Sequence, residues 1–155
     1  MEQHLIDLHC DTLSALYKNG EKASLTENDL CVNIKGLRRG NSLAQFFACY
    51  VNAKEYIKEC TEEMDTETKT GLAGMDTKIN PGNRVFNPDT AVWDSSWKVV
   101  NELIDLAYKQ ETENFGIVHT FEELEKNIAT DKLSGILTVE EGGVLNGRME
   151  RLEQL

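Results

Sequence analysis

The stretch from Leu43 to Val51 reads LAQFFACYV, and it decides the fold class. It is almost continuous in apolar and aromatic residues and does not alternate regularly with polar ones. A strand of this kind is usually covered on both faces, which favours a parallel sheet over an antiparallel sheet with one wet face. We therefore expect a buried parallel strand at residues 43–51.

Short apolar runs and helical patterns alternate on both sides of this stretch. Further strands are expected at residues 4–9, 115–119 and 134–139. Helices, or in the second case a helix or turn, are expected at residues 13–18, 35–39, 52–64, 87–111, 121–129 and 148–155. Strands that alternate with helices predict an α/β architecture with parallel strands.

Two of the expected helices have clear start signals. Asn87 followed by Pro88 offers a cap and a first-turn proline, and Thr120 with Glu123 has the spacing of a capping box. Residues 65–86 are rich in Gly, Thr and Asp, so we expect a long surface insertion there. The helix at 87–111 should bury one face, made of Trp93, Trp97, Val100, Ile104 and Ala107.

Composition limits the class of protein. The chain has 155 residues, enough for one domain with a core, and its 16 basic and 27 acidic residues give a formal net charge of −11. So acidic a chain is a poor candidate for attraction to nucleic acid or to an anionic membrane. No basic leader segment and no run near the ~20 apolar residues of a membrane span is visible, so neither a signal peptide nor a span is predicted.

The four cysteines are widely spaced and form no Cys-x-x-Cys pair. Two of them, Cys10 and Cys49, lie in apolar, strand-like runs. We therefore expect reduced, buried thiols in a cytoplasmic protein. The four are Cys10, Cys31, Cys49 and Cys60.

The first predicted strand ends in residues that can bind metal. Side chains alternate along a strand, so Asp7, His9 and Asp11 would point to one side if the strand persists, with Cys10 on the other. An imidazole and a carboxylate on one face can share a divalent ion such as zinc. Alone, His-x-Asp is a weak signal, because such residues at a strand end also bond to backbone.

A second strand end strengthens this signal. Glu140 follows the strand at 134–139 and precedes Gly142-Gly143, which permits a sharp turn and a close backbone approach. In a parallel sheet both strands end at the same edge, so Glu140 could reach a metal held by His9 and Asp11. For Glu141 a solvated position in the turn is expected, and His4 and His119 are interpreted as structural or exposed.

With these residues the chain resembles the membrane (renal) dipeptidase family and its soluble bacterial relatives. The matching segments are IDLHCDT at residues 6–12, LRRG at 37–40 followed by QFFA at 45–48, and ILTVE at 136–140 with the two glycines after it. Their order and spacing are more specific than any one of them. The match runs through the whole chain apart from the insertion at 65–86.

The resemblance implies a TIM-type (β/α)8 barrel of about 250 residues or more. Residues 1–155 would be the N-terminal half of this one domain, with the C-terminal half absent. The chain also stops inside a helical pattern, as a cut would leave it.

The resemblance also implies a site with two zinc ions. His9 and Asp11 match the ligands of one ion, and Glu140 matches the carboxylate that bridges both. Glu141 stands where the family usually has its first glycine, and it remains the alternative bridging residue. The other ligands, and an Arg that holds the substrate carboxylate, would come from strands beyond Leu155.

The function implied is hydrolysis of dipeptides by a metal-bridged water, with a homodimer left open. The isolated chain should be inactive, since it holds at most three ligands. One alternative is an amidohydrolase-type barrel acting on cyclic amides, although those enzymes favour His-x-His at the first strand. Another is a non-catalytic truncated barrel that serves as an interaction module.

Overall fold

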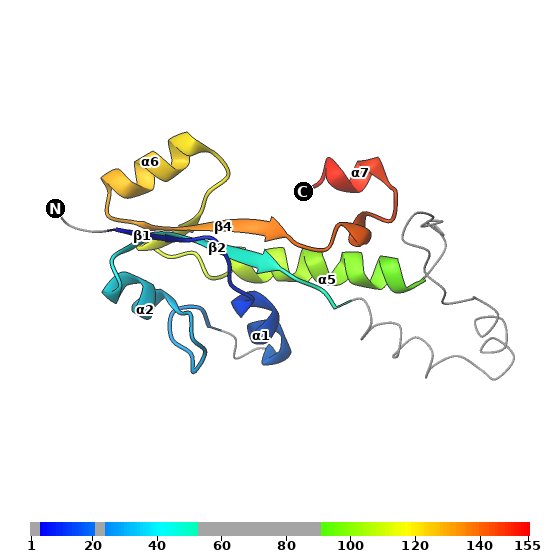
Figure 1. The fold of residues 1–155 in the computed structure, drawn as a ribbon, viewed down its shortest axis with the longest axis horizontal. Coiled ribbons are helices and arrows are strands. Elements are labelled where there is room, and N and C mark those ends of the chain that lie inside the picture. Colours follow the sequence, from blue (N-terminus) through cyan, green and yellow to red (C-terminus); the bar gives the residue numbers. More distant parts are fainter. Residues whose placement is uncertain (1–3, 21–23, 53–90) are drawn as a thin grey trace, which may run out of the picture. The chain divides into compact units, whose positions relative to one another are not determined.

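The computed structural model describes residues 4–20, 24–52 and 91–155 (Figure 1). The predicted polar helix at 52–64, the insertion at 65–86 and the helix start at Asn87 and Pro88 therefore fall, apart from Asn52, outside the described residues. The chain forms two compact units, of which the first comprises Met1–Val51 and Val100–Glu140. This first unit contains the whole sheet.

The sheet has four parallel strands in the order β1-β2-β4-β3. This confirms the α/β class with parallel strands alternating with helices, as expected for part of a (β/α)8 barrel. β1 ends two residues earlier than expected, at Asp7. The strands are β1 (Leu5–Asp7), β2 (Ser42–Cys49), β3 (Phe115–Ile117) and β4 (Leu133–Val139).

The helices agree with most of the expected positions. α6 has the predicted bounds, whereas α7 is a single turn that ends at Leu152, short of the predicted end at residue 155. None of the helices in the described segments is both long and apolar enough to cross a membrane. The helices are α1 (Thr12–Lys18), α2 (Ile34–Arg39), α5 (Ala91–Tyr108), α6 (Phe121–Ala129) and α7 (Met149–Leu152), with a 3₁₀ turn, η2, at Gly142–Leu145.

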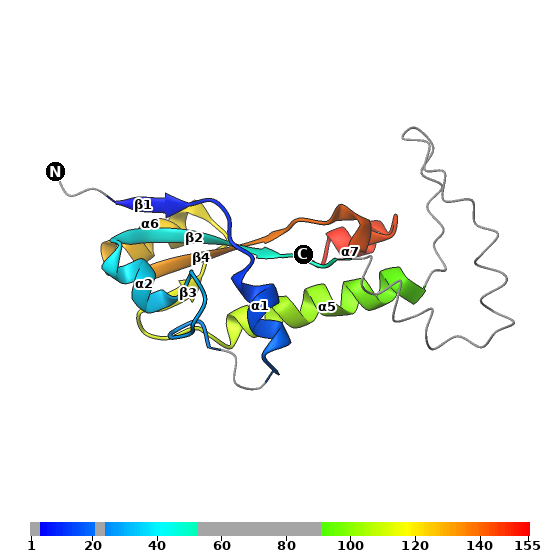
Figure 2. The same cartoon turned by 60° about the horizontal axis from the view of Figure 1, so that its bottom comes forward.

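The strand order departs from a simple barrel succession at one place. β4 pairs between β2 and β3, so the chain reverses direction across the sheet after β3. Parallel crossovers are right-handed, and a reversal therefore puts the connecting helix on the opposite face. Figures 1 and 2 show α6 on one side of the sheet and α1 with α2 on the other. Asn127 of α6 donates from Nδ2 to Ser134 Oγ of β4 at 3.1 Å.

Aromatic and aliphatic side chains form the core of the sheet unit. Phe47 of β2 and Phe115 of β3 are fully buried and meet edge to face, with ring centroids 6.1 Å apart. On α5 the predicted stripe is buried to different degrees: Val100 and Ala107 are fully buried, whereas Trp97 and Ile104 are half-buried. The buried face is instead completed by Ser96, Val99 and Leu103, while the side chain of Trp93 falls outside the described residues.

Two of the three cysteines in the described residues are buried, as predicted. Cys10 and Cys49 are buried and unpaired, and burial raises the pKa of Cys49 to about 12. Cys31 is exposed, so the prediction of buried thiols is wrong there. Cys60 lies outside the described residues.

The capping box of α6 forms as predicted. The Glu123 backbone N–H donates to Thr120 Oγ1 at 3.2 Å, and the Thr120 N–H donates to Glu123 Oε2 at 3.3 Å. Glu123 Oε2 also accepts the His119 backbone N–H at 2.7 Å. This hydrogen bond to the ionised form lowers the pKa of Glu123.

The lowered pKa of Glu123 predicts a pH-dependent contribution to stability. Because its folded pKa lies below the ordinary value of 4.5, the contribution is complete above pH 4.5 and is lost as the pH falls through the folded pKa. The stability difference between wild type and Glu123→Gln should shrink below pH 4.5, as measured by urea unfolding. Glu125→Gln, on the same helix outside the capping box, is the control. A Glu123→Gln difference that stays constant into acid would contradict the assignment.

A second stability prediction concerns Gly135 on β4. A Cβ built there would lie 2.8 Å from Ile117 Cδ1 and from Phe115 Cζ, which are both packed in the core. Gly135→Ala should therefore lower the free energy of unfolding by about 1–3 kcal/mol. Gly142→Ala is the matched control, because its Cβ would meet nothing within 4 Å. Equal stability of the two variants would show that the core yields around Gly135.

Candidate metal centre

The chain leaves β1 by an irregular path. The register pairs Asp7 with Gln45, and the next contacts are Cys10 N–H to Phe46 O at 3.1 Å and Ala48 N–H to Cys10 O at 2.9 Å. These two hydrogen bonds of Cys10 place it beside Phe47. Three residue steps along one chain thus oppose two along the other, as in a β-bulge.

The extra residue changes which side chains share a face. Cys10 is buried, and desolvation raises its pKa, while the side chains of His9 and Asp11 are about half exposed. This agrees with the prediction that Cys10 points away from its two neighbours. The prediction that Asp7 points the same way as His9 and Asp11 assumed an unbroken strand. The strand ends at Asp7 instead, and its carboxylate Oδ1 accepts the His9 backbone N–H at 3.3 Å.

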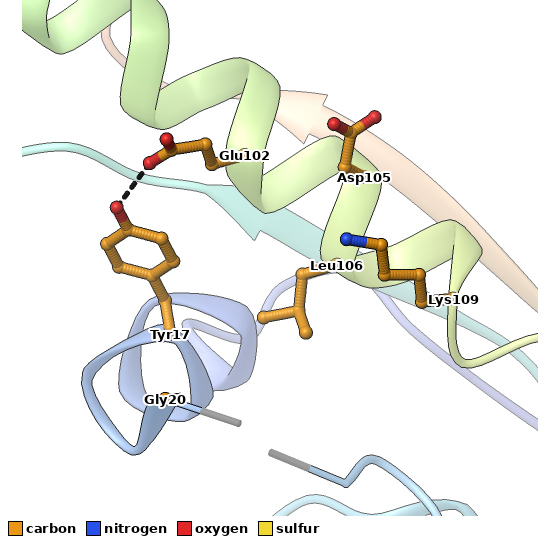
Figure 3. Close-up of a pocket in the computed structure, with 6 residues that line it drawn as sticks. All are labelled: Tyr17, Gly20, Glu102, Asp105, Leu106 and Lys109. Carbon is orange, nitrogen blue, oxygen red and sulfur yellow. Dashed lines mark hydrogen bonds between the residues drawn. The ribbon is translucent and has the colours of Figure 1, made fainter. Parts of the chain in front are cut away.

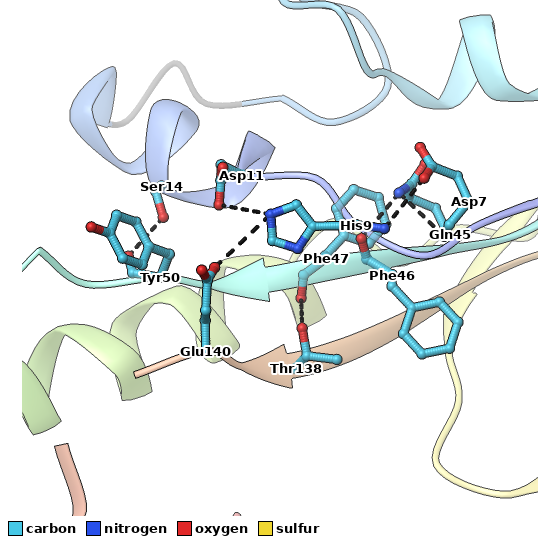
Figure 4. A network of polar contacts seen from close by, with 10 residues as sticks. All are labelled: Asp7, His9, Asp11, Ser14, Gln45, Phe46, Phe47, Tyr50, Thr138 and Glu140. Carbon is cyan, nitrogen blue, oxygen red and sulfur yellow. Dashed lines mark hydrogen bonds and ion pairs between the residues drawn. The ribbon is translucent and has the colours of Figure 1, made fainter. Parts of the chain in front are cut away.

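The structure brings His9, Asp11 and Glu140 together (Figure 4). His9 Nε2 lies 3.6 Å from Asp11 Oδ1 and 3.9 Å from Glu140 Oε2. One ligand atom from each residue falls within 4.8 Å of the others. His9 and Asp11 come from the segment between β1 and α1, and Glu140 is the residue after β4.

This arrangement fits a divalent ion of the zinc type. Zinc binds nitrogen and oxygen at about 2.0–2.2 Å, so neighbouring ligand atoms of a tetrahedral site lie about 3.3–3.6 Å apart. The two distances from His9 Nε2, 3.6 and 3.9 Å, are close to that range. Two carboxylates so close to each other repel, and a cation between them would offset the repulsion. One imidazole with two carboxylates is a donor set suited to zinc and similar ions.

Glu141 is engaged in a different contact. Its Oε1 accepts the Gly143 backbone N–H at 3.0 Å, which makes it the N-cap of η2. The expected glycine-dependent turn is not seen at Gly142, because its φ is not positive and a Cβ there would meet nothing. The alternative ligand Glu141 thus has a local partner, whereas Glu140 points toward His9 and Asp11 in Figure 4.

Other contacts fix the surroundings of the three side chains. Ser14 Oγ donates to Tyr50 O at 2.8 Å, which ties the first turn of α1 to the chain just after β2. Thr138 Oγ1 donates to Phe47 O at 3.5 Å between β4 and β2. The segments that carry Asp11 and Glu140 are therefore each hydrogen-bonded to β2 or to the residues just after it.

Two other features lie outside this group. A cavity of about 330 Å³ is lined by residues of α1 and α5 and by Gly20 and Lys109, which follow these helices; here the Tyr17 hydroxyl donates to the Glu102 carboxylate (Figure 3). It contains none of the three predicted ligands. His119 is exposed and its Nε2 lies 2.6 Å from the Tyr108 hydroxyl, in agreement with a structural role.

One polar residue near the candidate metal centre was not predicted from the sequence. Gln45 of β2 is fully buried, and its Nε2 donates to Phe46 O at 3.0 Å and lies 3.5 Å from Asp7 O. The available signal was a single amide in the otherwise apolar run LAQFFACYV. Such a residue is informative because a buried polar group is costly unless it is hydrogen-bonded.

Comparison with known proteins identifies the family. No individual curated protein matches the chain. The model of one family, described as membrane dipeptidase (peptidase family M19), matches residues 1–155. Because that match covers every residue of the chain and agrees with the parallel α/β fold, the chain belongs to the membrane dipeptidase family, peptidase family M19.

Proposed function

We propose that the full-length protein carrying this chain is a zinc-dependent dipeptidase. Residues 1–155 would form part of one barrel domain, with an insertion at about 65–86, and its remaining ligands would come from later strands. The observation that carries the proposal is the convergence of His9, Asp11 and Glu140 within 4.8 Å, in a chain of a dipeptidase family. A cytoplasmic location is part of the proposal, supported by the unpaired, buried thiols of Cys10 and Cys49.

The three side chains would hold the metal in different ways. His9 would hold zinc through Nε2 and Asp11 through a carboxylate oxygen, while Glu140 would be the carboxylate shared by the two ions of a complete site. When bound at such a site, paired zinc ions polarise the scissile carbonyl and acidify a water. His9, Asp11 and Glu140 have side chains that are 54, 59 and 50% exposed, which leaves room for a small peptide to approach.

The backbone around the ligands would keep these groups in position. Asp7 holds the His9 backbone N–H at 3.3 Å, and Cys10 pairs with β2 on both of its sides. Asp11 lies directly before α1 as its N-cap residue, so its position follows from the start of that helix. Fixed ligands reduce the reorganisation that metal and substrate binding would otherwise require.

An amidohydrolase-type barrel is less well supported. Such enzymes favour a second histidine where this chain has Asp11, and the family match is to dipeptidases. The alternative of a non-catalytic module differs measurably from the dipeptidase proposal, because it requires neither stoichiometric zinc nor peptide hydrolysis by the full-length protein.

Substitution of the ligands provides the direct test. In the full-length protein, His9→Ala, Asp11→Asn and Glu140→Gln should each weaken zinc binding about 100-fold or more, because even outer-shell partners of metal ligands contribute 10–100-fold. Zinc affinity is measured by calorimetric titration of metal-free protein, and activity by release of amino acids from a panel of dipeptides.

The matched controls are Glu141→Gln and His119→Ala. Glu141 is the neighbouring carboxylate that caps η2, and His119 is a histidine bonded to Tyr108. Both variants should bind zinc like the wild type. A loss of binding in Glu141→Gln with none in Glu140→Gln would transfer the bridging role to Glu141. A wild type that binds no zinc and cleaves no dipeptide would refute the proposal.

The 155-residue chain by itself should bind zinc weakly. It offers three of the predicted ligands, and in this proposal two ions need more than three. Calorimetric titration of the isolated chain should give a dissociation constant at least about 100-fold higher than that of the full-length protein. Tight binding of two ions by the isolated chain would instead mean that it contains further ligands.

A further inference from the structure

The buried side chain of Gln45 has an unusual hydrogen-bond balance. It is 0% exposed, and its register partner on β4 is Gly135, over which Phe115 and Ile117 pack. Its Oε1 accepts no hydrogen bond from any residue in the described parts of the chain. An unsatisfied amide oxygen in apolar surroundings lowers stability, and an apolar side chain of similar size would avoid that loss. Core packing alone therefore does not account for a glutamine at this position.

The amide nitrogen of Gln45 lies where β1 separates from β2. Nε2 donates to Phe46 O at 3.0 Å and lies 3.5 Å from Asp7 O, as Figure 4 shows. Phe46 O in turn accepts the Cys10 backbone N–H at 3.1 Å. One side-chain amide thus contacts the carbonyl at which β1 ends and the carbonyl to which the chain returns.

The chain between these two contacts carries His9. Only Leu8 and His9 lie between Asp7 and Cys10. The extra residue in this segment makes Cys10, and not His9, the lateral partner of the buried Phe47, so Cys10 faces the core and His9 faces the other side. A register slip of one residue would exchange those faces. The orientation of His9 therefore depends on keeping both ends of the bulge in place.

We propose that Gln45 is a positioning residue, whose side-chain amide fixes the bulge between Asp7 and Cys10 and thereby holds His9 Nε2 next to Asp11 and Glu140. Gln45 itself contacts neither metal nor substrate in this role. The inference rests on the proposed metal-binding function of His9, and it adds a residue that acts through the backbone.

The test uses Gln45→Met and Gln45→Leu in the full-length protein. Both remove the amide and its unsatisfied oxygen, so the thermal midpoint should stay the same or rise. The zinc dissociation constant of the metal-free protein should nevertheless increase about 10-fold or more, the range found for groups that orient metal ligands. Backbone amide exchange of His9 and Cys10, measured without metal, should become faster.

Ser134→Ala is the matched control. Ser134 is equally buried on the neighbouring strand β4, but its Oγ bonds to Asn127 and not to the bulge. This variant should keep the wild-type zinc affinity and the wild-type exchange of His9 and Cys10, whatever its effect on the thermal midpoint.

The outcomes separate this inference from the proposed function. Wild-type zinc affinity and wild-type amide exchange in the Gln45 variants would overturn the positioning role and leave the dipeptidase proposal intact. A lowered thermal midpoint with unchanged zinc affinity would likewise overturn it, because it would make Gln45 a purely structural residue. If the wild type bound no zinc, the proposed function would fail, and the exchange rates of His9 and Cys10 would decide the role of Gln45.

Discussion

The arrangement of the candidate site depends on the parallel pairing of β2 with both of its neighbours. β1 and β4 are not paired with each other; they lie on opposite sides of β2, about 9–10 Å apart at two strand spacings. His9 and Glu140 therefore meet across β2. Because the pairing on both sides is parallel, β1 and β4 end at the same edge, and long side chains can close the remaining distance.

The same constraint explains why β2 carries a small residue below the site. The hydrogen bonds of Cys10 place Asp11 level with Ala48, and the β2–β4 register pairs Ala48 with Thr138. Laterally paired residues share a face, so Ala48 and Thr138 continue the row that begins at the candidate ligand Asp11. A bulky residue at position 48 would lie in the space that His9 and Glu140 span. The apolar continuity of 43–51 thus supports the core on one face and leaves room for the ligands on the other.

The sequence predicted best those helices and strands whose own residues carry a clear local signal. The capping box gave α6 its bounds, and the apolar run at 43–51 predicted β2 as a buried parallel strand. What failed depended on tertiary contacts. On α5, Val99 and Leu103 are more deeply buried than the predicted Trp97 and Ile104, because the packing partner selects the face. The position of β3 beyond β4 is likewise set by pairing over distance, which no local pattern encodes.

In the candidate site, too, local sequence predicted some features and tertiary contacts determined the others. Residue types at two strand ends made His9, Asp11 and Glu140 candidates, and the family resemblance implied that they are ligands; the structure brings the three together. The alternation rule failed at Asp7, because a bulge adds one residue and exchanges the faces that follow it. The Gln45 amide, which contacts both ends of this bulge, is far from Asp7 and Cys10 in the sequence. From the sequence it could be noticed only as an unexplained polar residue in an apolar run.

The departure at Glu141 also has a physical explanation. The resemblance seen in the sequence implies a glycine at this position, and glycine is needed where φ is positive or where backbone must approach closely. Glu141 has φ −98° in extended backbone, a conformation open to any residue, and its carboxylate caps η2 through the Gly143 N–H. A glutamate there is therefore compatible with the turn and gains a capping bond that glycine cannot make. The adjacent Glu140 is left to face His9 and Asp11, so two successive carboxylates have different local roles.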